Sequence, residues 1–85
     1  MTVTDQKAAL EGIRAQFKQD TRLRGTDWEE HPGGDVVLRL TFSHALDEKT
    51  LGGIIDQLRI AGWWAAMTFD DRPAIAVSCS GALDG

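Results

Sequence analysis

Apolar residues recur at helical spacing in two segments of the chain. In the first, residues 4–19, the apolar side is formed by Leu10, Ile13 and Phe17. In the second, residues 47–61, it is formed by Leu51, Ile54, Ile55 and Leu58. Because these positions lie three and four residues apart, both segments are predicted to be amphipathic helices.

Capping residues mark the ends of the two predicted helices. Thr2 with Asp5, or Thr4 alone, is placed to accept hydrogen bonds from the free amides of the first turn. Asp47 is placed to do the same for the second helix, and Gly62 is typical of the left-handed residue that ends a helix.

Two glycines lie inside the second predicted helix, at Gly52 and Gly53. Each costs roughly 1 kcal/mol relative to alanine in a helix interior. Their presence predicts a close approach of this helix to its neighbours, and a flexible joint is the alternative.

Four further segments alternate between apolar and polar residues, as β-strands do: 21–30, 35–43, 63–69 and 74–80. The first is interrupted at Gly25, which predicts an edge strand with a bulge. Turn residues at 31–34 and 70–73 join the strands into two hairpins. The predicted inward face consists of Val36, Leu38, Leu40, Phe42, Trp63, Ala65, Met67, Phe69, Ile75, Val77 and Cys79.

The element order is therefore α-β-β-α-β-β, in a single α+β domain spanning residues 1–85. We expect a four-stranded, mainly antiparallel sheet with both helices on one face. Eighty-five residues supply one hydrophobic core and not two. A helix joins the second and third strands, so these run in the same direction and the two hairpin turns point to opposite ends of the sheet.

The two halves of the chain resemble each other. Residues 10–18 and 51–59 share leucine, glycine, isoleucine and glutamine when they are aligned at an offset of 41. A hairpin follows each, so residues 4–43 and 46–80 form two α-β-β units that a pseudo-twofold axis would relate. The alternative is that amphipathic helices share apolar positions anyway, although amphipathicity does not demand the shared glycine and glutamine.

The sheet face opposite the helices is predicted to carry the alternate strand residues. They are Val37, Arg39, Thr41, Trp64, Ala66, Thr68, Ala76, Ser78 and Ser80. A tryptophan among small residues is typical of a contact surface, so this face is predicted to form a homodimer or partner interface. The alternative is that Trp64 is a partly covered edge residue, or that a bulge reverses the faces of Trp63 and Trp64.

Acidic residues gather at the two predicted turns. The set predicted to bind a partner is Trp28, Glu29, Glu30, Asp35, Asp70 and Asp71. Solvated turns carry the same residue types, which is the alternative. If the first turn does bind, its complement is an arginine-rich surface, because opposite charges steer association.

The chain holds 9 basic and 13 acidic residues, a net charge of −4, which argues against nonspecific attraction to nucleic acid or anionic lipid. A single-stranded nucleic acid alternative uses Arg22, Arg24, Arg39 and Trp64. No apolar run approaches the roughly 20 residues that cross a bilayer, so we expect no membrane association. The first residues lack the pattern of a signal peptide, so we expect a cytoplasmic protein.

Residues with catalytic or metal-binding chemistry form no recognisable motif. Ser43, His44 and Asp47 lie in one short loop, where a catalytic triad does not assemble, and helix capping explains Ser43 and Asp47 better. Cys79 is the single cysteine, so an internal disulfide is excluded, and its apolar neighbours predict that it is buried. No phosphate-binding glycine motif is present. We expect no cofactor and no bound metal.

Taken together, these features predict a non-enzymatic inhibitor or regulator that binds another macromolecule. The expected partner is a protein or nucleoprotein complex whose basic surface is covered, and the expected assembly is a homodimer. By size and charge the chain is similar to small inhibitors that phages direct against host machinery, anti-CRISPR proteins among them, and it would then work in the host cytoplasm. The alternatives are the nucleic acid module and a small enzyme whose site forms in an oligomer.

Overall fold

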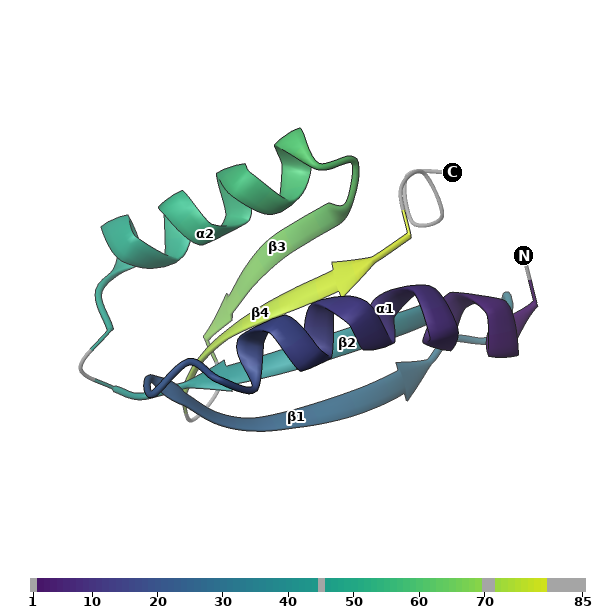
Figure 1. The fold of residues 1–85 in the computed structure, drawn as a ribbon, viewed down its shortest axis with the longest axis horizontal. Helices are drawn as coiled ribbons and strands as arrows, with labels where there is room; N and C mark the ends of the chain where they lie inside the picture. Colours follow the sequence, from purple (N-terminus) through teal and green to yellow (C-terminus); the bar gives the residue numbers. More distant parts are fainter. Residues whose placement is uncertain (1, 45, 70–71, 80–85) are drawn as a thin grey trace.

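A computed structural model describes residues 2–44, 46–69 and 72–79 of the chain. Its elements are α1 (Val3–Phe17), β1 (Leu23–Glu30), β2 (Val36–Phe42), α2 (Glu48–Ile60), β3 (Trp64–Phe69) and β4 (Pro73–Ser78) (Figure 1). The predicted order is confirmed, and every boundary lies within two residues of the predicted one.

The four strands form one antiparallel sheet in the order β1-β2-β4-β3, and both helices lie on the same face of it (Figure 1). Both β2 and β3 are antiparallel to β4, so they run in the same direction, as predicted. The register of β1 shifts between Leu23 and Gly25, which confirms the predicted bulge in an edge strand.

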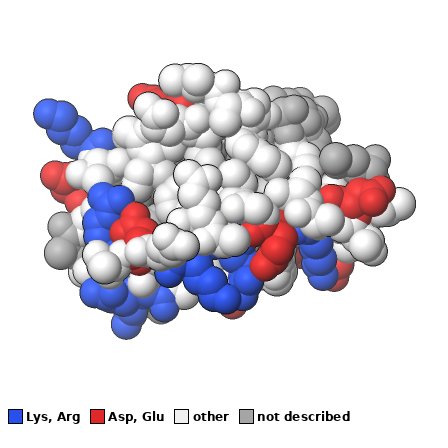
Figure 2. Space-filling model, viewed as in Figure 1, with Lys and Arg blue, Asp and Glu red and all other residues white. Residues whose placement is uncertain are grey.

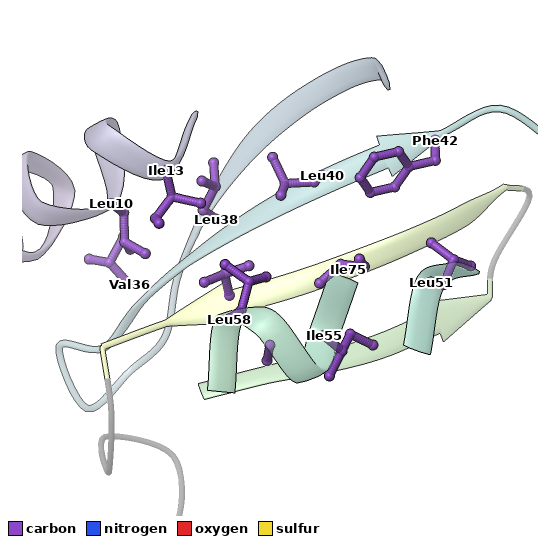
Figure 3. Close-up of a cluster of buried hydrophobic side chains, with 12 residues drawn as sticks. Leu10, Ile13, Val36, Leu38, Leu40, Phe42, Leu51, Ile55, Leu58 and Ile75 are labelled. Carbon is purple, nitrogen blue, oxygen red and sulfur yellow. The ribbon is translucent and has the colours of Figure 1, made fainter. Parts of the chain in front are cut away.

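The hydrophobic core lies between the helices and the sheet (Figure 3). It consists of Leu10, Ile13, Val36, Leu38, Leu40, Phe42, Leu51, Ile55, Leu58, Ala65, Ile75 and Val77. The register sets Leu38 opposite Val77 and Leu40 opposite Ile75, so apolar residues of neighbouring strands share this face. Alternation within each strand therefore predicted the residues that face the helices, but Val37, Ala74 and Ser78 of the opposite face are buried as well, at 3%, 1% and 0% exposed.

Three predictions about the inward residues have different outcomes. Trp63 and Met67 are half-buried and pack against the core, as predicted. The side chain of Phe69 lies outside the described residues. The prediction that Cys79 is buried is wrong, because Cys79 follows the last residue of β4 and is only half-buried.

Gln6 is a buried polar side chain in α1 that links the helix to the β1–β2 turn. Its amide nitrogen donates to the carbonyl of Gly34 at 2.8 Å, and its amide oxygen accepts from the N–H of Val36 at 2.9 Å. The side chain is 4% exposed, so the two bonds are shielded from water. They fix the first turns of α1 against a turn 28 residues further along the chain.

The predicted helix caps are present. The Thr2 hydroxyl accepts from the N–H of Asp5 at 3.1 Å in a capping box. At the end of α2 the N–H of Trp63 donates to the carbonyl of Leu58, and that of Gly62 donates to Arg59, both at 3.0 Å. This is a Schellman motif, which requires the left-handed backbone that Gly62 adopts, with φ of +97°.

The prediction that α2 approaches its neighbours closely at Gly52 and Gly53 is wrong for the residues that the structure describes. A Cβ atom added at either glycine would have no atom within 4 Å. The two positions therefore leave bare backbone on the surface of α2.

The strand order gives the two α-β-β units equivalent places. The hairpins β1–β2 and β3–β4 lie on either side of the central β2–β4 pair, which is antiparallel. A twofold repeat requires this arrangement, and the duplication itself stays a prediction.

Replacing Gln6 by alanine is expected to lower the free energy of unfolding by about 2 to 3 kcal/mol, because each buried backbone group that loses its partner costs about 1 to 3 kcal/mol. Urea denaturation measures the change. Gln19→Ala is the matched control, since Gln19 is exposed, and its effect should stay within about 0.5 kcal/mol. An effect of Gln6→Ala as small as that of the control would contradict this account.

Two glycine substitutions in α2 and its cap should have opposite signs. Gly62→Ala should destabilise the fold by about 1 kcal/mol, because alanine is strained at positive φ. Gly52→Ala should stabilise it by up to about 1 kcal/mol, because the position is helical and its Cβ meets no neighbour. Thermal unfolding of both variants tests the pair, and shifts of the same sign would contradict it.

Candidate functional site

The sheet face opposite the helices presents twelve positions in three rows, because directly paired residues point to the same side. The rows are Glu29, Val37, Ser78 and Trp64, then Asp27, Arg39, Ala76 and Ala66, then Gly25, Thr41, Ala74 and Thr68. We call these twelve positions the open face, since neither helix lies over it (Figure 1). Trp64 belongs to it and Trp63 packs on the helix side, so the predicted faces of the two tryptophans are confirmed.

All of the predicted sheet-face residues except Ser80, which lies outside the described residues, are on the open face. Their role as a dimer interface stays a prediction. The structure adds that the face is divided into two unlike halves. Its charged positions, Asp27, Glu29 and Arg39, are all on β1 and β2, and its positions on β3 and β4 carry no charge.

The uncharged half of the open face is built from small side chains next to Trp64. Ala74 and Ser78 of β4 are buried, at 1% and 0% exposed, and Trp64 and Ala66 are half-buried. The hydroxyl oxygen of Thr68 is buried and has no hydrogen-bond partner in the part of the chain that the structure describes. Because Ala74 and Ser78 are covered, the surface that this half offers for contact comes from the half-buried residues Trp64, Ala66, Thr68 and Ala76.

The charged half contains a hollow of about 550 Å³. It is lined by Asp27, Trp28, Glu29, Arg39, Thr41, Arg72 and Ala74. The Arg39 guanidinium and the Glu29 carboxylate pair across the strands at 3.3 Å. Asp27 and Arg72 form no ion pair within residues 2–44, 46–69 and 72–79, so one carboxylate and one guanidinium remain to meet a partner.

Asp27, Arg72 and Ala74 were not predicted as site residues. The alternation along each strand places Asp27 and Ala74 on this face. It does not show that β4 pairs with β2, and that pairing is what brings Ala74 beside Thr41. The sequence therefore lacked the strand order that was needed to predict this site.

The six residues predicted to bind a partner through the acidic turns do not form one surface. Trp28 packs half-buried against the core, on the helix side. Glu29 lies on the open face beside Arg39, whereas the Glu30 carboxylate lies 3.5 Å from the Lys7 ammonium. Asp35 is half-buried, and Asp70 and Asp71 lie outside the described residues.

The four residues of the nucleic acid alternative are not brought together either. Arg22 donates to both carboxylate oxygens of Asp20, at 2.9 and 2.7 Å, and this hydrogen bonding lowers the pKa of Asp20. Arg24 donates to a backbone carbonyl, and Arg39 pairs with Glu29. Trp64 lies on β3, at the opposite edge of the sheet from β1.

Basic residues follow the β1 side of the molecule, at the lower margin of Figure 2, and acidic residues lie between them. The ion pairs Lys7–Glu30, Arg14–Glu11 and Arg22–Asp20 explain the alternation. Such exposed pairs contribute little to stability, but they remove the dense basic stripe that phosphate binding needs.

The loop before α2 has the predicted capping role. The Asp47 carboxylate accepts from the N–H of Thr50 at 2.8 Å, and hydrogen bonding by Thr50 lowers the pKa of Asp47. His44, in the same loop, is exposed. A carboxylate committed to a helix N-terminus is not placed to orient a catalytic imidazole.

Two negative findings apply to the described residues. None of their His, Cys, Asp and Glu side chains gather in groups of three or more that would hold a metal ion. None of their helices is long and apolar enough to cross a membrane. Comparison with protein-family models, curated proteins and solved structures finds no match to this chain.

Proposed function

We propose that the chain is a non-enzymatic protein-binding module that covers part of a larger protein with its open face. The observation that carries the proposal is the division of this face into an uncharged half around Trp64 and a charged hollow beside it. Protein interfaces combine an aromatic anchor in a dry centre with polar groups that set the orientation.

The charges around the hollow define the chemistry of the partner. Glu29 and Arg39 neutralise each other, whereas Asp27 on β1 and Arg72, directly before β4, have no such pair among the described residues. An unpaired charge buried in an interface costs several kcal/mol. A matching protein therefore presents a basic side chain to Asp27, an acidic one to Arg72 and an apolar surface to Trp64.

The size of the domain supports a function by occlusion. The molecule measures 35 × 23 × 21 Å along its principal axes, so its largest face provides on the order of the 800 Å² that each partner contributes to a standard interface. A domain that covers this area excludes other ligands of the same surface. Its net charge of −4 steers it towards a basic one. Inhibition or regulation of a larger protein in the cytoplasm, the class that includes anti-CRISPR proteins, is the function we propose.

Site-specific crosslinking tests the face that binds. A photoreactive residue in place of Ala66, on the open face, should capture one protein in cells that express the chain naturally. The same residue in place of Ala8, which is exposed on α1, should not capture that protein. Capture at Ala8 alone, or at neither position, would overturn the proposal.

Binding of the purified partner then tests the charge argument. Asp27→Lys should raise the Kd at least about tenfold, because it places like charge against the basic side chain expected there. Asp56→Lys is the matched control, since Asp56 is exposed on α2 and the change in net charge is the same. Calorimetry measures both, and equal affinities for the two variants would contradict the proposed orientation.

A further inference from the structure

The hollow of the open face lies over small residues next to Asp27. Thr41 and Ala74 line it, and the register places them side by side on β2 and β4. Gly25 of β1 stands on the other side of Thr41 and has no side chain. The space of about 550 Å³ is therefore a gap between small residues, and it is large enough to admit a long side chain of another protein.

Asp27 lines this gap with a carboxylate that no other group neutralises. Neither of its oxygens accepts a hydrogen bond or takes part in an ion pair within the part of the chain that the structure describes. The register pairs Asp27 with Arg39, but the Arg39 guanidinium lies 3.3 Å from the carboxylate of Glu29. Two carboxylates and one guanidinium therefore leave a negative charge at this end of the hollow.

Thr41 lies diagonal to Asp27, with the missing side chain of Gly25 between them. Asp27 pairs with Arg39 and Gly25 pairs with Thr41, and such diagonal neighbours on two antiparallel strands lie about 7 to 8 Å apart. The Thr41 hydroxyl has no hydrogen-bond partner among the described residues. A planar group with several N–H donors can therefore enter the gap and bond to both side chains.

We infer that this end of the hollow receives an arginine of the protein partner, with its guanidinium on Asp27; the inference rests on the proposed function. A guanidinium donates two parallel N–H groups to the two oxygens of a carboxylate, and it has further N–H groups for a hydroxyl such as that of Thr41. The ammonium of lysine is more strongly hydrated and has no such fork, so it gains less from the same site. Arginine is also among the residues that contribute most to the affinity of protein interfaces.

The other charges of the molecule favour a cation at Asp27 and disfavour one at the far end of the hollow. The net charge of −4 steers the chain towards a basic surface. Arg72 lies four residues before Ala76, which shares the row of Asp27, so it is about 13 Å further along the strand direction. Its positive charge confines the guanidinium to the Asp27 end, and an acidic group of the partner would face Arg72.

N-acetyl-arginine amide, which has a guanidinium and no carboxylate, tests the site without the partner. In an NMR titration of the isotope-labelled chain, the backbone amides of Asp27, Thr41 and Ala74 should shift and saturate. The amide of Asp56, which is exposed on α2, is the internal control and should not. Asp27→Asn should weaken binding at least about threefold, and N-acetyl-lysine amide should bind the wild type at least about threefold more weakly.

Gly25→Val tests the gap at constant charge. A Cβ atom at Gly25 meets no atom within 4 Å and the residue has no positive φ, so the fold should accommodate valine, which is favoured in strands. The valine side chain would stand between Asp27 and Thr41 and should weaken binding of the arginine probe at least about threefold. A urea denaturation curve checks that the variant is folded.

Equal affinities for the arginine and lysine probes, or a titration that Asp27→Asn leaves unchanged, would overturn the inference. A shift at Asp56 as large as that at Asp27 would do the same. Absence of probe binding together with capture of a protein at Ala66 would overturn the arginine and leave the proposed function. Probe binding without capture at Ala66 would instead overturn the proposed function, and with it the protein source of the guanidinium.

Discussion

The side-chain amide of Gln6 holds α1 against the β1–β2 hairpin, and the placement of the open face depends on this contact. Both atoms of the amide bond to backbone groups at the turn, at Gly34 and Val36. Val36 is fully buried, so its N–H has no access to water as a substitute partner. With its first turns fixed there, α1 lays its apolar side over β1 and β2. The helix thereby covers one face of the hairpin and leaves Asp27, Glu29 and Arg39 on the other.

The face on which a side chain lies within one strand or helix could be predicted from the sequence. The pairing of one strand with another could not. Alternation assigned Trp63 and Trp64 to opposite faces correctly, because side chains of a strand point to alternate sides whatever lies beside it. The hollow needs β4 beside β2, and no pattern within either strand contains that pairing. The roles of the glycines could not be told apart from the sequence for a related reason. Gly62 has the positive φ that ends a helix, whereas Gly52 has neither a positive φ nor a close neighbour.

Charge is the property that changed most between sequence and structure. The sequence suggested free carboxylates at the first hairpin turn, but Glu29 and Glu30 each lie within reach of a cation from another element. Arg22 is likewise committed to Asp20, two residues away. A count of charges therefore describes long-range steering but not the chemistry of a contact. That chemistry is set by the few charged groups, such as Asp27, that face a hollow without a partner of their own among the described residues.

The two edge strands of the sheet are poorly suited to pairing with a strand of another molecule. Edge strand β1 carries a bulge at Gly25 and acidic residues along its length, and both features discourage the addition of another strand. Edge strand β3 carries no charge, but the Arg59 guanidinium donates to the carbonyl of Ala65 at 3.1 and 2.9 Å. With both edges protected in this way, the open face is the surface of the sheet that remains for contact with another molecule.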